Sequence, residues 1–284
     1  MLTKKEIKEL NIFACEIRKA TFSAIHGAGR GHIGGAMSMV EALAVLYGKE
    51  MKIDPKEPRM PERDRFVLSK GHCGPSLYAT LAVKGFFPRE ALPTMNHGGT
   101  ILPSHVDRLK TPGIDFSAGS LGTGISVAVG SALGAKVKGL DYRTYCIVGD
   151  GECDEGQVWE AAMFAASKKL DNLVVLVDYN KQQLDGWTKD VCDLGDIGAK
   201  FSQFGWNTVE VDGHNVSAIY DALEAARACK GQPTAIILDT VKGKGCSYAE
   251  KAGLCHHLDM TDEQFAQETA LQDARIDALR KEED

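Results

Sequence analysis

Two short apolar segments, each followed by an oxygen-bearing side chain, constrain the fold of this chain more than any other feature. Residues 145–148 lead to Asp150, and residues 173–177 lead to Asn180. Between them, residues 157–169 carry apolar side chains at helical spacing, which predicts a strand, a helix and a second, parallel strand. Because the carboxyl ends of parallel strands meet at one edge of a sheet, we expect Asp150 and Asn180 to lie side by side.

The chemistry of this edge indicates a metal and phosphate site. A carboxylate and an amide oxygen suit a hard cation, and the glycine-rich turn at residues 149–152 opens a helix whose N-terminus favours a phosphate. Each residue also has a common structural use, because Asp is frequent as a helix N-cap and Asn is frequent in turns. Their pairing at two adjacent strand ends favours the metal site.

The rest of the chain alternates helices and buried strands in the same way. Residues 86–117 show little periodicity and are expected to form a long functional loop. Helices are predicted at residues 4–25, 38–47, 75–84, 125–137 and 216–230, and strands at 65–68, 208–211 and 234–238. The pattern predicts an α/β protein with a mostly parallel central sheet flanked by helices. We expect a single domain over residues 1–284, in which 261–284 form a helical tail.

The composition argues against several classes of function. A net charge of −6 at pH 7 argues against a general affinity for nucleic acid or an anionic membrane. No apolar run reaches membrane-spanning length, and the charged N-terminus does not resemble a signal peptide. The eight cysteines include no CxxC pair, which is typical of reduced thiols. We therefore expect a cytoplasmic protein without nucleic-acid or membrane partners.

Glycine-rich segments and histidines form a second pattern. Gly29, Gly31 and Gly34 match the dinucleotide-binding motif GxGxxG, but the match is weak because a helix precedes it where that motif requires a strand. A lone histidine is more often a surface or core residue than a catalytic one, so only a combination is informative. Four histidines stand at expected strand or helix ends, namely His32, His72, His105 and His256.

Several motifs occur together between about residues 10 and 260. The sequence GDG at residues 149–151, followed by Asn180, is similar to the signature of the thiamine diphosphate-binding superfamily that includes the transketolases. The segments FVLSKGH at 66–72, GSLGTG at 119–124 and NKQQLDG at 180–186 resemble transketolases more specifically, because related dehydrogenase subunits are not expected to contain them. The resemblance implies a three-layer thiamine diphosphate-binding fold.

The resemblance also implies how the diphosphate end of the cofactor is held. Mg²⁺, or Ca²⁺, would bind Asp150, the side-chain oxygen of Asn180 and the main-chain carbonyl of Gln182, with two phosphates and a water completing an octahedron. Three further groups are implied to hydrogen-bond the diphosphate, namely the amide of Gly151 and the imidazoles of His72 and His256. Glu152, in the same turn, is counted among the cofactor-binding residues.

Other residues are implied to contact the cofactor rings or to move protons. Leu121 and Leu184 would pack on the rings, although Leu121 is almost equally typical of a core residue. The carbonyl of Gly119 would accept a hydrogen bond from the aminopyrimidine amine. Neutral histidines close to the donor hydroxyls are suited to proton transfer at neutral pH. By position in the motifs these are His32, His105 and His256.

Two departures from the family pattern leave the sugar open. The family usually has proline after the first of these histidines, where this chain has Ile33, and it often reads Gly-His-Pro around the third, where this chain reads Ser-His-Val at residues 104–106. Both loops are expected to face the substrate channel.

Two further assignments stay open. The neighbour His257 remains an alternative to His256. Glu155 and Glu160 are either subunit-interface residues or solvated carboxylates at a helix start.

The resemblance implies a transketolase, which moves a two-carbon ketol unit from a ketose phosphate to an aldose phosphate, as in the pentose phosphate pathway. In transketolases a second domain binds the aminopyrimidine, and we do not expect the residues after 260 to supply it. We therefore expect the N-terminal subunit of a split transketolase, which is active only with a C-terminal partner subunit in an α₂β₂ assembly.

Other functions remain open at this point. Instead of a ketose phosphate of the pentose phosphate pathway, the donor could be a branched or sulfonated ketose. The chain could also serve a different thiamine diphosphate enzyme, such as a 2-oxoacid dehydrogenase or deoxyxylulose-phosphate synthase. A nucleotide-binding α/β protein without this chemistry is the remaining alternative.

Overall fold

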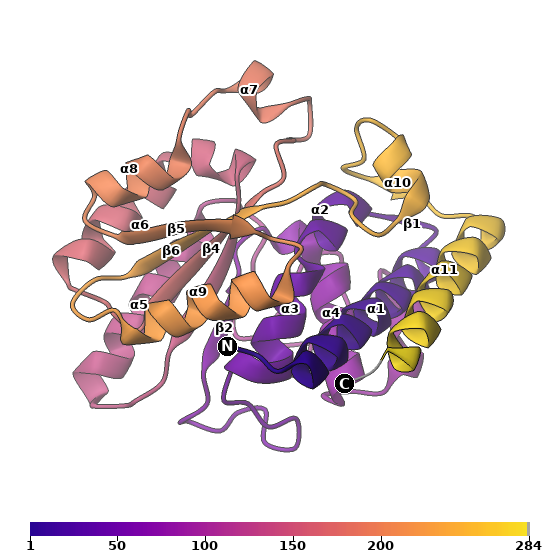
Figure 1. The fold of residues 1–284 in the computed structure, drawn as a ribbon, viewed down its shortest axis with the longest axis horizontal. Coiled ribbons are helices and arrows are strands. Elements are labelled where there is room, and N and C mark those ends of the chain that lie inside the picture. The colour runs from indigo at the N-terminus through magenta and orange to yellow at the C-terminus, as the bar shows by residue number, and fades with distance from the viewer. Residues whose placement is uncertain (283–284) are drawn as a thin grey trace.

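Five parallel strands form the central sheet of the protein, for which the computed structural model describes residues 1–282 (Figure 1). All four strand pairs in the sheet are parallel. The strands lie in the order β2-β3-β4-β6-β5, with the bounds Arg65–Leu68 (β2), Thr144–Gly149 (β3), Leu173–Tyr179 (β4), Asn207–Asp212 (β5) and Thr234–Asp239 (β6). The predicted α/β class with a mostly parallel sheet is confirmed.

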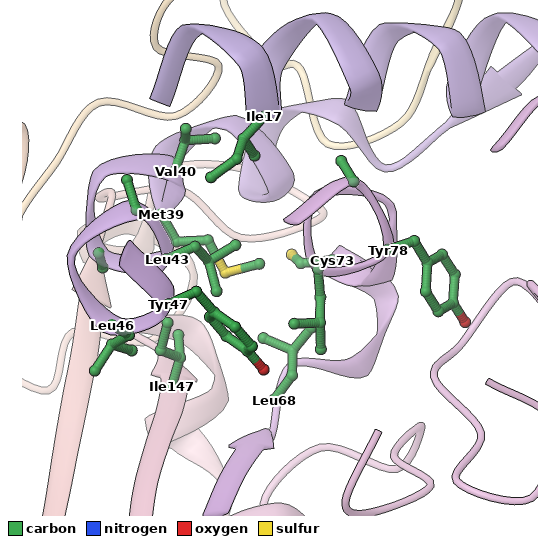
Figure 2. Close-up of a cluster of buried hydrophobic side chains, with 14 of the residues drawn as sticks. Ile17, Met39, Val40, Leu43, Leu46, Tyr47, Leu68, Cys73, Tyr78 and Ile147 are labelled. Carbon is green, nitrogen blue, oxygen red and sulfur yellow. The ribbon is translucent and has the colours of Figure 1, made fainter. Parts of the chain in front are cut away.

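Side chains alternate between the two faces of the sheet, and each face has its own apolar layer. On one face, Tyr145 and Ile147 join a buried cluster with α1, α3, α4 and α9, part of which Figure 2 shows. On the other face, Cys146 and Val148 join a cluster with α5, α6 and α8. The bounds of these helices are Lys4–Gly27 (α1), Val40–Val45 (α3), Gly74–Lys84 (α4), Thr123–Lys138 (α5), Gly156–Ser167 (α6), Ile197–Gln203 (α8) and Val216–Ala228 (α9). Helices on both faces give the three layers.

The helix expected at residues 38–47 is wrong in its bounds. The chain instead forms α2 (Ile33–Ser38), α3 and a single π turn, Leu46–Glu50, with a break at Met39. The early start of α2 depends on close backbone approach, because a Cβ on Gly34 would lie 2.3 Å from the carbonyl oxygen of Cys255. Two glycines at a helix start weaken the helical signal in the sequence although they permit this contact.

Two long helices pack against each other, and a small two-stranded sheet contacts one of them. Helix α11 (Asp262–Lys281) lies beside α1 (Figure 1), and each begins with a capping box, at Thr261 and Thr3 respectively. Strands β1 (Arg30–Gly31) and β7 (Leu258–Asp259) pair in antiparallel fashion. Two-residue strands so far apart in the sequence leave no periodicity, and the sequence did not predict them.

The remaining helices are short and lie in loops. Within the expected long loop at 86–117, the only helical turn is the 3₁₀ segment Arg89–Thr94. The others are the 3₁₀ segments Gly71–Cys73 and Gly151–Asp154, α7 (Thr188–Val191) and α10 (Ser247–Lys251). Over residues 1–282, no helix combines the length and apolar character that crossing a membrane requires.

Candidate functional site

One pocket lies at the carboxyl ends of β2, β3 and β4, where the βαβ pattern predicts it. It encloses about 310 Å³. All twelve predicted site residues line it, namely His32, His72, His105, Gly119, Leu121, Asp150, Gly151, Glu152, Asn180, Gln182, Leu184 and His256. Sequence reasoning assigned no role to Lys70 and Lys242, which also line the pocket. Residues from widely separated parts of the chain, between positions 32 and 256, therefore meet at one edge of the sheet.

Asp150 follows β3 directly and is almost fully buried. Its Oδ2 accepts hydrogen bonds from the backbone N–H of Lys181 (2.6 Å) and the hydroxyl of Thr188 (3.1 Å), and its Oδ1 accepts from the N–H of Gly151 (2.9 Å). Burial and the nearby Asp178 carboxylate raise the pKa of Asp150 to about 6. A carboxylate with a raised pKa in such a pocket is suited to a cation, because a cation would compensate its buried charge.

Asn180 and Gln182 present two further oxygens beside Asp150. The side-chain amide of Asn180 donates to Asp178 Oδ2 at 2.8 Å, and its Oδ1 accepts from the backbone N–H of Gln182 at 3.2 Å. The carbonyl oxygen of Gln182 accepts from the ammonium of Lys242 at 3.0 Å. A carboxylate, an amide oxygen and a backbone carbonyl are the donor set that hard cations such as Mg²⁺ and Ca²⁺ prefer.

This donor set differs from a cluster of acidic, histidine or cysteine ligands. Within residues 1–282, no three or more such side chains are arranged to hold a metal ion. The set around Asp150 includes only one side chain of those types, because its other two oxygens belong to an amide and to the backbone. The ammonium of Lys242 already lies against the Gln182 carbonyl, which indicates that this oxygen attracts positive charge.

Asp178, inside β4, connects the loops around the pocket. Its buried carboxylate pairs with the ammonium of Lys70, which also donates to the carbonyl of Gly35 at 2.8 Å. It accepts further hydrogen bonds from the hydroxyls of Ser38 and Thr240, each at 2.6 Å. Although burial opposes ionisation, the Lys70 charge lowers the pKa of Asp178. Sequence reasoning missed this pair, for which the available signal is an Asp within an otherwise apolar strand.

Imidazole rings form one wall of the pocket. The ring centroid of His32 lies 5.2 Å from that of His72, 6.0 Å from that of His105 and 5.2 Å from that of His256. Burial, with the neighbouring imidazoles and lysines, lowers the pKa of His32 to about 4, of His72 to about 2 and of His256 to about 3. These three rings are therefore neutral at pH 7, and each keeps an unprotonated nitrogen that can accept a hydrogen bond.

The structure separates His256 from His257 by their surroundings. His256 lines the pocket, and its Nδ1 lies 3.2 Å from the ammonium of Lys242. The ring of His257 lies 4.6 Å from that of His32 but does not line the pocket.

Hydrogen bonds to Glu152 hold the glycine-rich turn in place. The carboxylate of Glu152 is buried and accepts from the N–H groups of Gly122 (2.8 Å) and Gly149 (3.0 Å) and from the hydroxyl of Ser69. Glu152 thus ties the GDG turn to the loop before α5. Leu184 is 64% exposed and Leu121 is partly buried, so both offer apolar surface at the pocket mouth. Glu155 and Glu160 are exposed and lie outside the pocket lining.

The fold and the site define an α/β protein with an oxygen-rich crevice at the carboxyl ends of parallel strands. Comparison with known families shows a match to the transketolase thiamine diphosphate binding domain over residues 11–271. The chain belongs to the transketolase family, in its thiamine diphosphate-binding part. The predicted family and transketolase class are confirmed, and thiamine diphosphate is the cofactor of this domain.

Individual relatives extend this assignment. The 6-deoxy-6-sulfo-D-fructose transketolase subunit of Clostridium sp. (strain MSTE9) is 51% identical, over 88% of this chain and 90% of the relative. An apulose-4-phosphate transketolase subunit of Phocaeicola vulgatus is 39% identical, over 98% of both chains. A transketolase variant from Pichia stipitis superposes with a TM-score of 0.86 at 28% identity, over 97% of this chain but 44% of its own length.

The buried Lys70–Asp178 pair predicts a stability effect. Asp178→Asn leaves the Lys70 cation buried without its counter-charge, so the free energy of unfolding is expected to fall by about 3–5 kcal/mol. Chemical denaturation measures this fall. Asp273→Asn, which breaks the exposed contact with Lys19, is the matched control and is expected to cost about 1 kcal/mol or less. Adding Lys70→Met to Asp178→Asn is expected to recover part of the lost stability. An Asp178→Asn variant as stable as the unmodified protein would contradict the buried Lys70–Asp178 ion pair.

Proposed function

We propose that this chain is the thiamine diphosphate-binding subunit of a split transketolase, which transfers a two-carbon ketol unit together with a C-terminal subunit. One observation carries the proposal: in a chain of this family, every residue assigned to the cofactor or to proton transfer lines the same pocket. The names of the two relatives that the chain matches nearly end to end, each called a transketolase subunit, support a second polypeptide.

In this proposal the pocket binds the diphosphate end of the cofactor through a divalent cation. Asp150, Asn180 and Gln182 provide oxygens for Mg²⁺ or Ca²⁺. When bound, thiamine diphosphate supplies the carbon nucleophile and the electron sink for ketol transfer. The diphosphate is assigned to the amide of Gly151 and to the imidazoles of His72 and His256, and the rings to three residues at the pocket mouth, Gly119, Leu121 and Leu184. Glu152 positions the GDG turn through its contacts with Gly122 and Gly149.

Proton transfer is assigned to His32, His105 and His256. The position of all three rings in one pocket supports this role. Burial keeps the imidazoles of His32 and His256 neutral at pH 7, so each ring has an unprotonated nitrogen that can accept a hydrogen bond from a sugar hydroxyl. The position of His105, with its ring 6.0 Å from that of His32, supports a shared path for the proton. Lys242 contacts both the Gln182 carbonyl and His256, and we assign it to positioning these two groups.

The proposed assembly is an α₂β₂ tetramer in the cytoplasm. Pairing with a C-terminal subunit would complete the cofactor site with the pyrimidine side. The contact between two copies of this chain is assigned to Glu155 and Glu160 at α6 on the family resemblance, and both side chains are exposed. The eight free cysteines among the described residues support a reducing compartment.

Two kinds of ketose donor are proposed. The first is a ketose phosphate of the pentose phosphate pathway. The second is a sulfonated or branched ketose, favoured by 51% identity to the subunit named for 6-deoxy-6-sulfo-D-fructose and by 39% identity to the subunit named for apulose 4-phosphate. The substitutions at Ile33 and at Ser104, beside two of the proton-transfer histidines, support a donor outside the pentose phosphate pathway.

Metal-dependent cofactor binding is predicted to depend on Asp150 and on pH. Calorimetry of the reconstituted enzyme is expected to show Mg²⁺-dependent binding of thiamine diphosphate that weakens as the pH falls below about 6, because a protonated Asp150 cannot ligate the metal. Asp150→Ala is expected to abolish this binding at every pH. Asp190→Ala removes an exposed carboxylate of α7 and should change nothing. An affinity of Asp150→Ala equal to that of the unmodified protein would disprove the ligand assignment.

Activity is predicted to require the partner subunit. The purified chain alone is expected to show no ketol transfer, and the chain mixed with its C-terminal subunit is expected to transfer ketol units to an aldose phosphate. Xylulose 5-phosphate, 6-deoxy-6-sulfo-D-fructose and apulose 4-phosphate, compared as donors, distinguish the two kinds of ketose. Normal turnover by the chain alone would disprove the split enzyme. Oxidation of a 2-oxoacid with an artificial electron acceptor, without ketol transfer, would disprove the transketolase activity.

A further inference from the structure

A second and larger cavity, of about 520 Å³, lies at the opposite end of β2 from the cofactor pocket. The loop that precedes β2 forms one side, and the loop at residues 108–115 forms the other. In Figure 1 the loop before β2 lies at the bottom of the view, away from α2. Five of its lining side chains are cationic, namely Arg59, Arg63, Arg65, Arg108 and Lys110. Asp115 is the one acidic residue that lines the cavity among the described residues.

The carboxylate of Asp115 makes its hydrogen bonds to groups within the protein. It accepts hydrogen bonds from both terminal nitrogens of Arg63, at 3.0 Å for Nη1, and from the backbone N–H of Phe66 at 2.9 Å. Arg65 also approaches it, with 4.0 Å between Arg65 Nε and Asp115 Oδ1. One carboxylate is therefore shared between two arginines, and it leaves the cavity strongly positive.

The two inner arginines are held in place by the fold. Arg63 is 7% exposed, and its Nε–H has no hydrogen-bond acceptor among residues 1–282. Arg65 stacks on the ring of Tyr142 at 4.7 Å and donates to the carbonyl of Pro61 at 2.9 Å. Burial lowers the pKa of Arg65, and the adjacent Arg63 cation lowers it further. Guanidinium groups fixed in this way cost little entropy when they bind an anion.

The three outer cations, Arg59, Arg108 and Lys110, are exposed. Within the described part of the chain, none of their side chains makes a hydrogen bond or an ion pair. The nearby Asp107 forms no ion pair with them within residues 1–282, and its Oδ1 instead accepts from the N–H of Leu109 and the hydroxyl of Ser117 in its own loop. This concentration of unpaired cations stands out in a protein whose net charge is −6.

We propose that this cavity binds a small phosphorylated molecule, a phosphate ester of a sugar or a nucleotide. The volume falls in the range of small-molecule sites, and planar guanidinium groups match phosphate oxygens in pairs. Apolar side chains of Pro58, Leu109 and Ile114 in the lining can contact the organic part of the ligand. The site is separate from the proposed ketol transfer. The loop that continues from His105 through residues 106–118 to Gly119 connects the two cavities, so an anion bound at Arg108 would contact the same loop.

The test compares two doubly substituted variants of equal charge by calorimetry, each reconstituted with the C-terminal subunit and with Mg²⁺ and thiamine diphosphate present to occupy the first pocket. Arg108→Gln with Lys110→Gln removes two exposed cations from the cavity. Lys4→Gln with Arg280→Gln removes two exposed cations that do not line it and serves as the control. The probes are fructose 1,6-bisphosphate, ADP and uncharged adenosine, and poly-glutamate represents an acidic protein segment.

The unmodified chain and the control are expected to bind fructose 1,6-bisphosphate or ADP, and the cavity variant is expected to bind it about tenfold more weakly or worse. Whichever of the two binds more tightly identifies a sugar phosphate or a nucleotide as the ligand class. Hydrogen exchange of residues 106–115 is expected to slow on binding. Equal affinity in both variants, tight binding of adenosine, or binding of poly-glutamate alone would overturn the proposal, as would the absence of binding at millimolar probe.

Discussion

The buried carboxylate of Asp178 is the interaction on which the arrangement of the pocket depends. It has no accessible surface, and it joins four side chains from separate parts of the chain, namely Ser38, Lys70, Asn180 and Thr240. Burying a carboxylate is unfavourable unless hydrogen bonds and a counter-charge compensate it. The ends of α2, β2, β4 and β6 are therefore held at one point. Because Asn180 donates its amide to Asp178, its oxygen is left to face Gln182 and the pocket.

The two buried carboxylates at the pocket, Asp178 and Asp150, are compensated in different ways. The Asp178 carboxylate is compensated inside the protein by Lys70. Asp150 has three hydrogen-bond donors but, within residues 1–282, no ion pair with a cationic side chain, which agrees with its raised pKa. His32, His72 and His256, which line the same pocket, remain neutral at pH 7 because burial and nearby cations suppress their protonation. The pocket thus retains one poorly compensated negative charge next to neutral proton carriers, a combination suited to a divalent cation and proton transfer.

Local patterns account for what is predictable from the sequence. Asp150 and Asn180 can be placed because each directly follows an apolar strand, and parallel pairing then sets them side by side. The Lys70–Asp178 pair spans 108 residues, and nothing in either local segment identifies the partner of the other. The contacts of Lys242 with Gln182 and His256 are equally non-local. The sequence does not predict the break at Met39, because the glycines that permit an early helix start also weaken the helical signal of this segment.

Strand β2 shows how one short element serves two chemically different ends. Its first residue, Arg65, lines the basic cavity, and Lys70, two residues beyond its last, lies in the cofactor pocket. Lys70 is neutralised by Asp178, whereas Arg65 competes with Arg63 for the single carboxylate of Asp115. A cation that is paired inside the protein supports structure, and one that shares its counter-charge keeps attraction for an external anion. The difference in pairing, more than the number of basic residues, therefore distinguishes a structural lysine from an anion site at the two ends of the same strand.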